Sequence, residues 1–175
     1  MKPVRGGLTL ITGGARAGKS AAALARARAL GGEEVSFIAT AAATDAEMTQ
    51  RIRAHKSQRS AAWETIEEPR EAAAALARTK HDVVVLDCLT LLVSNLLLAG
   101  GEEAVRAGIE DLLSVWRKSG KTLIVVSNEV GMGIVPENPL AREYRDQLGW
   151  ANQKVAAAAD EVVLLVAGLE LRLKP

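Results

Sequence analysis

Short apolar runs recur along the chain, and stretches with helical spacing separate them. Five of these runs are apolar on both faces, a pattern that predicts strands buried within a mainly parallel sheet. They are LTLIT (8–12), VSFIAT (35–40), VVVLDC (83–88), TLIVVS (122–127) and EVVLLV (161–166).

Alanine-rich segments between these runs predict helices. They are SAAALARARAL (20–30), the stretch from Thr44 to Arg59, PREAAAALARTK (69–80), GEEAVRAGIEDLLSVWRKSG (101–120) and a last helix from Asn138 and Pro139 to about Ala159. Thr44 and Glu47 form a capping box for the second helix, and Pro69 suits the first position of the third. Strands alternating with helices predict one α/β domain over residues 1–175, with helices on both faces of the sheet.

The composition is that of an ordinary globular protein, with 49% hydrophobic and 25% charged residues among 175. A formal net charge of +1 gives no reason to expect a nucleic acid or an anionic membrane as partner. No stretch stays apolar for the ~20 residues of a membrane span, and the opening MKPVRGG lacks the apolar region of a signal peptide. With Cys88 as the single cysteine, we expect a cytoplasmic protein without internal disulfides.

The first strand leads directly into GGARAGKS and then into a helix, which is the context of a phosphate-binding P-loop. Its glycines let backbone N–H groups surround phosphate oxygens, the lysine adds positive charge, and the serine hydroxyl suits Mg²⁺. The alternative is a glycine-rich turn with a chance lysine. The predicted nucleotide-binding residues are Gly13, Gly14, Ala15, Arg16, Ala17, Gly18, Lys19 and Ser20.

Asp87 ends the third predicted strand and is the candidate carboxylate for a magnesium ion, together with Ser20. The alternative is an aspartate that caps the turn after the strand. SNEVG follows the next strand, where a signalling GTPase would carry an N/T-K-x-D pattern, so that class is disfavoured.

One histidine, His55, lies on the predicted helix 44–59 among basic residues. Arg51, His55 and Arg59 are spaced by one helical turn, and a neutral imidazole beside cations would attract phosphate. Such a histidine suits nucleophilic attack on an α-phosphate. A solvated basic helix with a half-buried histidine is the alternative.

A second unusual stretch is NEVGMGIVPENPLAREYRDQLGWANQ at 128–153. Its helix carries a stripe of arginine, amide and glycine residues that is separate from the apolar stripe. This stripe predicts a large polar partner, either a substrate or another subunit. The candidate substrate residues are Arg142, Arg145 and Asn152.

Together these segments resemble the family of bifunctional adenosylcobinamide kinases/adenosylcobinamide-phosphate guanylyltransferases over nearly the whole chain. The segments are LITGGARAGKS, FIAT, the E-M-x-x-R-I-x-x-H-K pattern at 47–56, LDCLTLLVSNLL, the stretch 128–153 and AAADEVVLLVAG. The resemblance implies a RecA-like P-loop fold, a homo-oligomer (a trimer being the best guess), and Mg²⁺ with ATP and GTP as substrates.

The implied chemistry has two parts. A nucleoside triphosphate phosphorylates the aminopropanol hydroxyl of adenosylcobinamide; GTP then guanylylates a histidine, which passes GMP to adenosylcobinamide phosphate. That histidine is His55 in this sequence, where Ala54 stands in place of a second histidine found in many relatives. The resemblance also places Ala39, Thr40, Lys56, Ser57, Gln58, Arg59 and Glu67 at the nucleotide, with Glu67 accepting hydrogen bonds from guanine.

Two other functions remain open from the sequence. One is a kinase alone, in which His55 only positions phosphate. The other is a nucleotide-dependent binding module that transfers no group to a corrinoid. The sequence also leaves open whether ATP or GTP serves the kinase step, and His81 is expected to be structural.

Overall fold

The computed structural model describes residues 6–42, 46–57 and 59–175, without the side chains of residues 46–48, 51, 54 and 55. The strands are β1 (Leu8–Gly13), β2 (Val35–Ala39), β3 (Glu64–Glu67), β4 (Val83–Asp87), β5 (Thr122–Val126), β6 (Glu161–Val166) and β7 (Leu169–Lys174). The helices are α1 (Lys19–Gly31), α2 (Ala46–Ser57), α3 (Ala72–Arg78), α4 (Leu89–Ser119) and α5 (Pro139–Ala158).

Over the described residues, seven strands form one sheet in the order β3-β2-β4-β5-β1-β6-β7. All neighbouring strands are parallel except β6 and β7, which form an antiparallel hairpin at one edge. No helix in the described part of the chain is long and apolar enough to cross a membrane.

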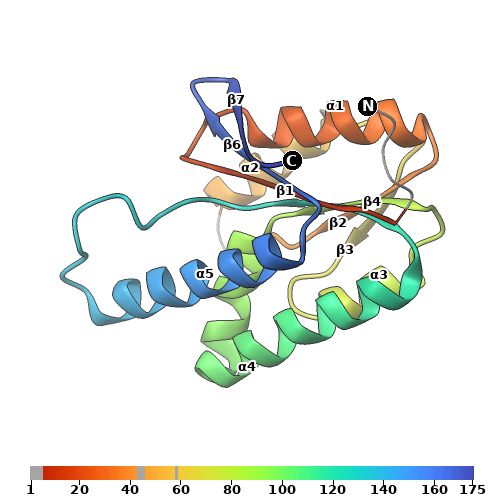
Figure 1. Cartoon of the computed structure of the whole chain (residues 1–175). Coiled ribbons are helices and arrows are strands. Elements are labelled where there is room, and N and C mark those ends of the chain that lie inside the picture. The colour runs from red at the N-terminus through yellow and green to blue at the C-terminus, as the bar shows by residue number, and fades with distance from the viewer. Residues whose placement is uncertain (1–5, 43–45, 58) are drawn as a thin grey trace.

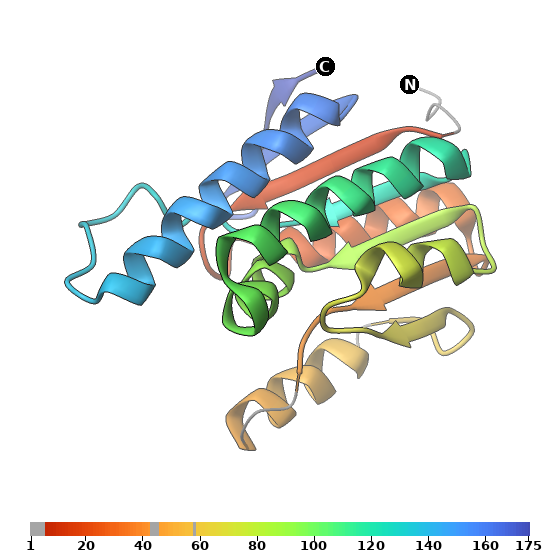
Figure 2. The same cartoon turned by 90° about the horizontal axis from the view of Figure 1, so that it is seen from below.

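Helices cover both faces of the sheet, as the alternating pattern predicted. Figure 2 shows α3, α4 and α5 on one face and α1 on the other. Two apolar cores result: Leu76, Leu112 and Leu148 belong to the first, and Ala27 and Phe37 to the second, under α1. Each of these side chains is at most 1% exposed, so both faces exclude water.

The five predicted strands are confirmed, and β3 and β7 are additional. The first helix, predicted over 20–30, runs from Lys19 to Gly31, with Gly32 at φ 58°. The predicted helix 101–120 is the second part of a longer helix, because α4 begins at Leu89 and contains non-helical backbone at Gly100 and Gly101.

Two predicted helix boundaries are wrong. Pro69 does not open a helix, because α3 begins at Ala72. The second helix does not reach Arg59, because α2 ends at Ser57. Arg59 therefore lies outside this helix, and the capping residue Thr44 lies outside the described residues.

Hydrogen bonds join the carboxyl ends of β2 and β4, which are neighbouring strands of the sheet (Figure 1). The Thr40 hydroxyl donates to the Cys88 carbonyl (2.7 Å) and accepts from the Cys88 N–H (2.8 Å). Asn95 of α4 donates to the carbonyls of Thr40 and Pro69, both at 2.9 Å. At the end of β1, a Cβ on Gly13 would lie 2.3 Å from the Leu165 carbonyl oxygen, so only glycine fits there.

Candidate active site

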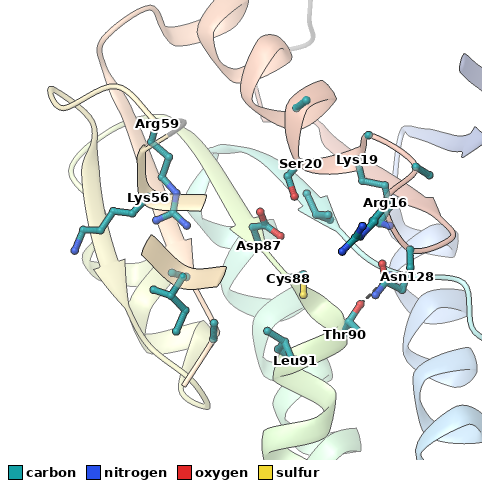
Figure 3. A pocket seen from close by; sticks show the side chains of 18 of the residues that line it. Arg16, Lys19, Ser20, Lys56, Arg59, Asp87, Cys88, Thr90, Leu91 and Asn128 are labelled. Atoms are coloured by element: carbon teal, nitrogen blue, oxygen red, sulfur yellow. Dashed lines mark hydrogen bonds between the residues drawn. The ribbon is translucent and has the colours of Figure 1, made fainter. Parts of the chain in front are cut away.

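A cavity of about 760 Å³ opens where β1, β2 and β4 end. Figure 3 shows Lys19 and Ser20 on one side, Lys56 and Arg59 on the other, and Asp87 between them. The cavity brings together most of the predicted site residues, which come from five separate parts of the chain. Those that line it are Ala15, Arg16, Ala17, Gly18, Lys19, Ser20, Ala39, Lys56, Arg59, Glu67 and Asp87.

The P-loop forms the first wall. Lys19 is only 8% exposed, and its ammonium group donates a hydrogen bond to the Gly14 carbonyl at 2.5 Å. Burial lowers the pKa of Lys19, while Cys88 and Asp87 act in the opposite direction. A partly desolvated ammonium group facing a cavity favours a bound anion such as phosphate.

The second wall carries two further cations. The Lys56 ammonium forms an ion pair with Glu67 at 3.0 Å, and both side chains are well exposed. The Arg59 guanidinium lies over the Phe37 ring, 3.6 Å from its centroid. Burial lowers the pKa of Arg59, although Asp87 and Glu67 oppose the shift. This stacking fixes the position of the guanidinium, which suits it to hold a phosphate.

The floor of the cavity offers oxygen ligands for a magnesium ion. Asp87 at the end of β4, Ser20 at the start of α1 and Thr90 in α4 line the same cavity. Magnesium in phosphate-transfer sites keeps several waters and uses one or two carboxylates together with phosphate oxygens. The described residues contain no cluster of three or more His, Cys, Asp or Glu for a metal. Ser20 and Asp87 are the described residues that could hold such an ion.

Some predicted residues lie elsewhere. Gly13 and Gly14 precede the part of the loop that lines the cavity, and Thr40 is fully buried with its hydroxyl bonded to Cys88. Ser57 is the exposed last residue of α2. Gln58 and the His55 side chain fall outside the described part of the structure, although the His55 backbone is helical.

The three candidate substrate residues form hydrogen bonds or an ion pair with other residues of the chain. Arg142 donates to the carbonyls of Pro136 (3.0 Å) and Glu137 (2.6 Å). Arg145 lies 3.5 Å from the Asp146 carboxylate. Asn152 accepts from the Ser127 hydroxyl and donates to the Asn128 carbonyl at 3.0 Å. Arg142 and Asn152 therefore tie α5 to the β5–α5 connection, whereas Arg145 pairs with its neighbour in α5.

Sequence reasoning missed several lining residues, among them Ile52, Leu91 and Asn128. The Asn128 backbone N–H donates to the Thr90 hydroxyl at 2.8 Å, which closes the cavity on the side of α4. Its position directly after β5 was the available signal, because parallel strands end at a common edge.

The order of strands in the sheet and the P-loop after β1 place this chain among the P-loop nucleotide-binding proteins with a RecA-like sheet. The flagellar accessory protein FlaH from Methanocaldococcus jannaschii is a structural neighbour with a TM-score of 0.56 and 16% identity. The match covers 97% of this chain and 79% of FlaH. At this identity the likeness shows a shared fold.

The sequence narrows the class further. Residues 9–173 match the model of the family "Cobinamide kinase / cobinamide phosphate guanyltransferase". Bifunctional adenosylcobalamin biosynthesis protein CobP of Pseudomonas aeruginosa is 44% identical, over 94% of this chain and 96% of CobP. CobU of Salmonella typhimurium, described in the same words, is 42% identical over 95% of this chain and 99% of its own.

The chain therefore belongs to the cobinamide kinase/cobinamide phosphate guanylyltransferase family, and the resemblance noted from its sequence is confirmed. Homologues in this family carry both activities and act in adenosylcobalamin biosynthesis.

The thiol at the cavity floor gives a testable consequence. Burial raises the pKa of Cys88 to about 11, and Asp87 adds to the shift, so the thiol stays protonated at pH 8. We expect the folded protein to react with a thiol reagent far more slowly than the same protein in urea, as followed by absorbance with a disulfide dye. Equal rates in both states would contradict this environment for Cys88.

Proposed function

We propose that this protein phosphorylates adenosylcobinamide and then transfers GMP from GTP to the product, using the one cavity for both nucleotides. The observation that carries the proposal is the meeting of P-loop, α2–β3 and β4 residues around Asp87. Both reactions develop negative charge at phosphorus, and both are stabilised by positioned cations in a partly desolvated site.

In the kinase step, the triphosphate lies along the P-loop with the Lys19 ammonium released from Gly14 to its β- and γ-phosphates. The substrate hydroxyl oxygen attacks the γ-phosphorus, the bond to the bridging oxygen breaks, and a nucleoside diphosphate and a proton leave. Ser20 and Asp87 would hold Mg²⁺, which when bound neutralises charge on the phosphate oxygens. Arg59 stands across the cavity and would stabilise the transferred group.

In the transferase step, a nitrogen of His55 attacks the α-phosphorus of GTP, forming a P–N bond and releasing pyrophosphate. A phosphate oxygen of adenosylcobinamide phosphate then attacks the same phosphorus, which restores the imidazole and gives adenosylcobinamide-GDP. The proposal for His55 rests on the family resemblance and on its place in α2 directly before Lys56, which lines the cavity.

Glu67 is the proposed guanine acceptor. Its carboxylate lies at the cavity beside Lys56 and is largely exposed, so it can accept from the N1 and N2 donors of guanine.

Three further proposals accompany this function. The protein forms a homo-oligomer, for which we propose a trimer. It is located in the cytoplasm, and residues 1–175 form a single domain. Two products separate the alternatives. A kinase alone would phosphorylate the corrinoid without forming a covalent GMP adduct, and a binding module would form neither product.

The first test compares Lys19→Ala, His55→Ala and His81→Ala with the wild type. With GTP and Mg²⁺, we expect intact-protein mass to rise by one GMP in the wild type and in His81→Ala, and not in His55→Ala. His55→Ala should still phosphorylate adenosylcobinamide. Lys19→Ala should lose about 10²-fold or more in the kinase rate, because the developing charge loses its cation.

His81 is a matched control because it is the other histidine of the chain and does not line the cavity. An adduct that persists in His55→Ala would assign the nucleophile to another residue. A wild type that gains no mass but phosphorylates the corrinoid would be a kinase only.

A second test concerns base recognition. ITP lacks the N2 amine of GTP, so the wild type should form the adduct from GTP with a KM lower by roughly tenfold. Glu67→Gln should lose most of this difference, because an amide is a weaker acceptor than a carboxylate. Discrimination that survives in Glu67→Gln would show that another group reads the base.

A further inference from the structure

The connection between β5 and α5 exposes a group of apolar side chains. Met132 is 81% exposed, Ile134 97% and Val135 58%. Single exposed apolar residues are common on protein surfaces, but three within four positions form a patch, and such patches mark binding surfaces.

Hydrogen bonds at both ends hold this loop in place. Arg142 donates to the Pro136 and Glu137 carbonyls, as described above, and the Gly131 N–H donates to the Glu129 carboxylate at 2.6 Å. The Glu129 N–H donates to the Gly13 carbonyl at 3.1 Å, at the start of the P-loop. A guanidinium bonded to two loop carbonyls presents the apolar residues on a fixed backbone.

The loop that carries the patch begins at the nucleotide cavity. Asn128, the first residue of the loop, lines that cavity. Figure 1 and Figure 2 both show the loop leaving the sheet at the edge where β1 leads into the P-loop. The loop therefore starts at the cavity and extends away from it, so a ligand that spans from Met132 to Asn128 would reach the cavity.

We infer that Met132, Ile134 and Val135 are the docking surface for the corrin ring of the substrate, an inference that rests on the proposed function. A cavity of about 760 Å³ is of ordinary size for one small ligand, and charged groups line it. It suits a triphosphate and the substrate's aminopropanol arm, but it cannot also take a corrin ring. The edge of the ring carries methyl groups and carboxamide arms. The methyl groups need apolar contacts and the carboxamide arms need solvent, and a surface outside the cavity offers both.

A second copy of the chain is the other conceivable occupant of the patch, but the molecule offers a better surface for it. Leu169, Leu171 and Leu173 of β7 are exposed along one side of an edge strand. Unpaired edge strands with apolar side chains are ready sites for association between chains. The loop patch is instead carried by a segment that starts at the nucleotide cavity, which the hydroxyl of the corrinoid must enter.

The test uses the full chain and the coloured corrinoid dicyanocobinamide as the probe. A Met132→Ser/Ile134→Ser variant is compared with the wild type and with Leu171→Ser/Leu173→Ser, which removes two exposed apolar residues elsewhere. Equilibrium dialysis read by visible absorbance should give corrinoid binding weaker by about tenfold for each loop side chain removed. The KM of the kinase for the corrinoid should rise in parallel.

GTP-dependent adduct formation should be unchanged in the loop variant, which also controls for folding because it needs an intact cavity. The β7 variant should bind the corrinoid as the wild type does. Unchanged corrinoid binding in the loop variant would overturn the inference, and loss of self-association in sedimentation would then make the loop a subunit contact. Wild-type protein that neither binds nor phosphorylates a corrinoid would instead overturn the proposed function itself.

Discussion

The partial desolvation of two cations around one carboxylate is the feature on which the site depends. Burial lowers the pKa of Lys19 and of Arg59, and Asp87 opposes the shift at both. Neither cation forms a close ion pair with Asp87 among the described residues, and Lys19 instead bonds to the Gly14 carbonyl of its own loop. An incoming phosphate supplies the negative charge that this arrangement lacks, so binding energy is directed at the groups that react.

The fold brings these groups together because its parallel strands end at a common edge. Gly13 allows β1 to turn against the Leu165 carbonyl, and Thr40 and Asn95 join the ends of β2, β4 and the β3–α3 connection. The same edge carries the β5–α5 loop, held by Arg142. Phosphate chemistry and the proposed corrin surface are thus built from neighbouring strand ends, as in other open α/β sheets.

Sequence patterns predicted the central strands and the P-loop because burial on both faces and a strand–loop–helix context leave strong local signals. The strand β3 (ETIE) leaves none, since it is short and polar and forms by pairing with β2. In β7, LELRLK alternates leucine with charged residues, a readable strand pattern that was missed. Thr40 and Arg142 were assigned to the site from motifs. In the structure Thr40 is bonded to Cys88, which is distant in sequence, and Arg142 is bonded to carbonyl groups of an irregular loop. Motif spacing cannot reveal such partners.

The central claim is that one cavity serves both nucleotides, and competition tests it most directly. The rate of GMP adduct formation from GTP should be measured against rising concentrations of a β,γ-imido ATP analogue with Mg²⁺. A shared cavity predicts that the analogue suppresses the adduct fully and that excess GTP restores it. An unchanged adduct rate with the analogue bound at one equivalent per chain would contradict the account and require a second nucleotide site.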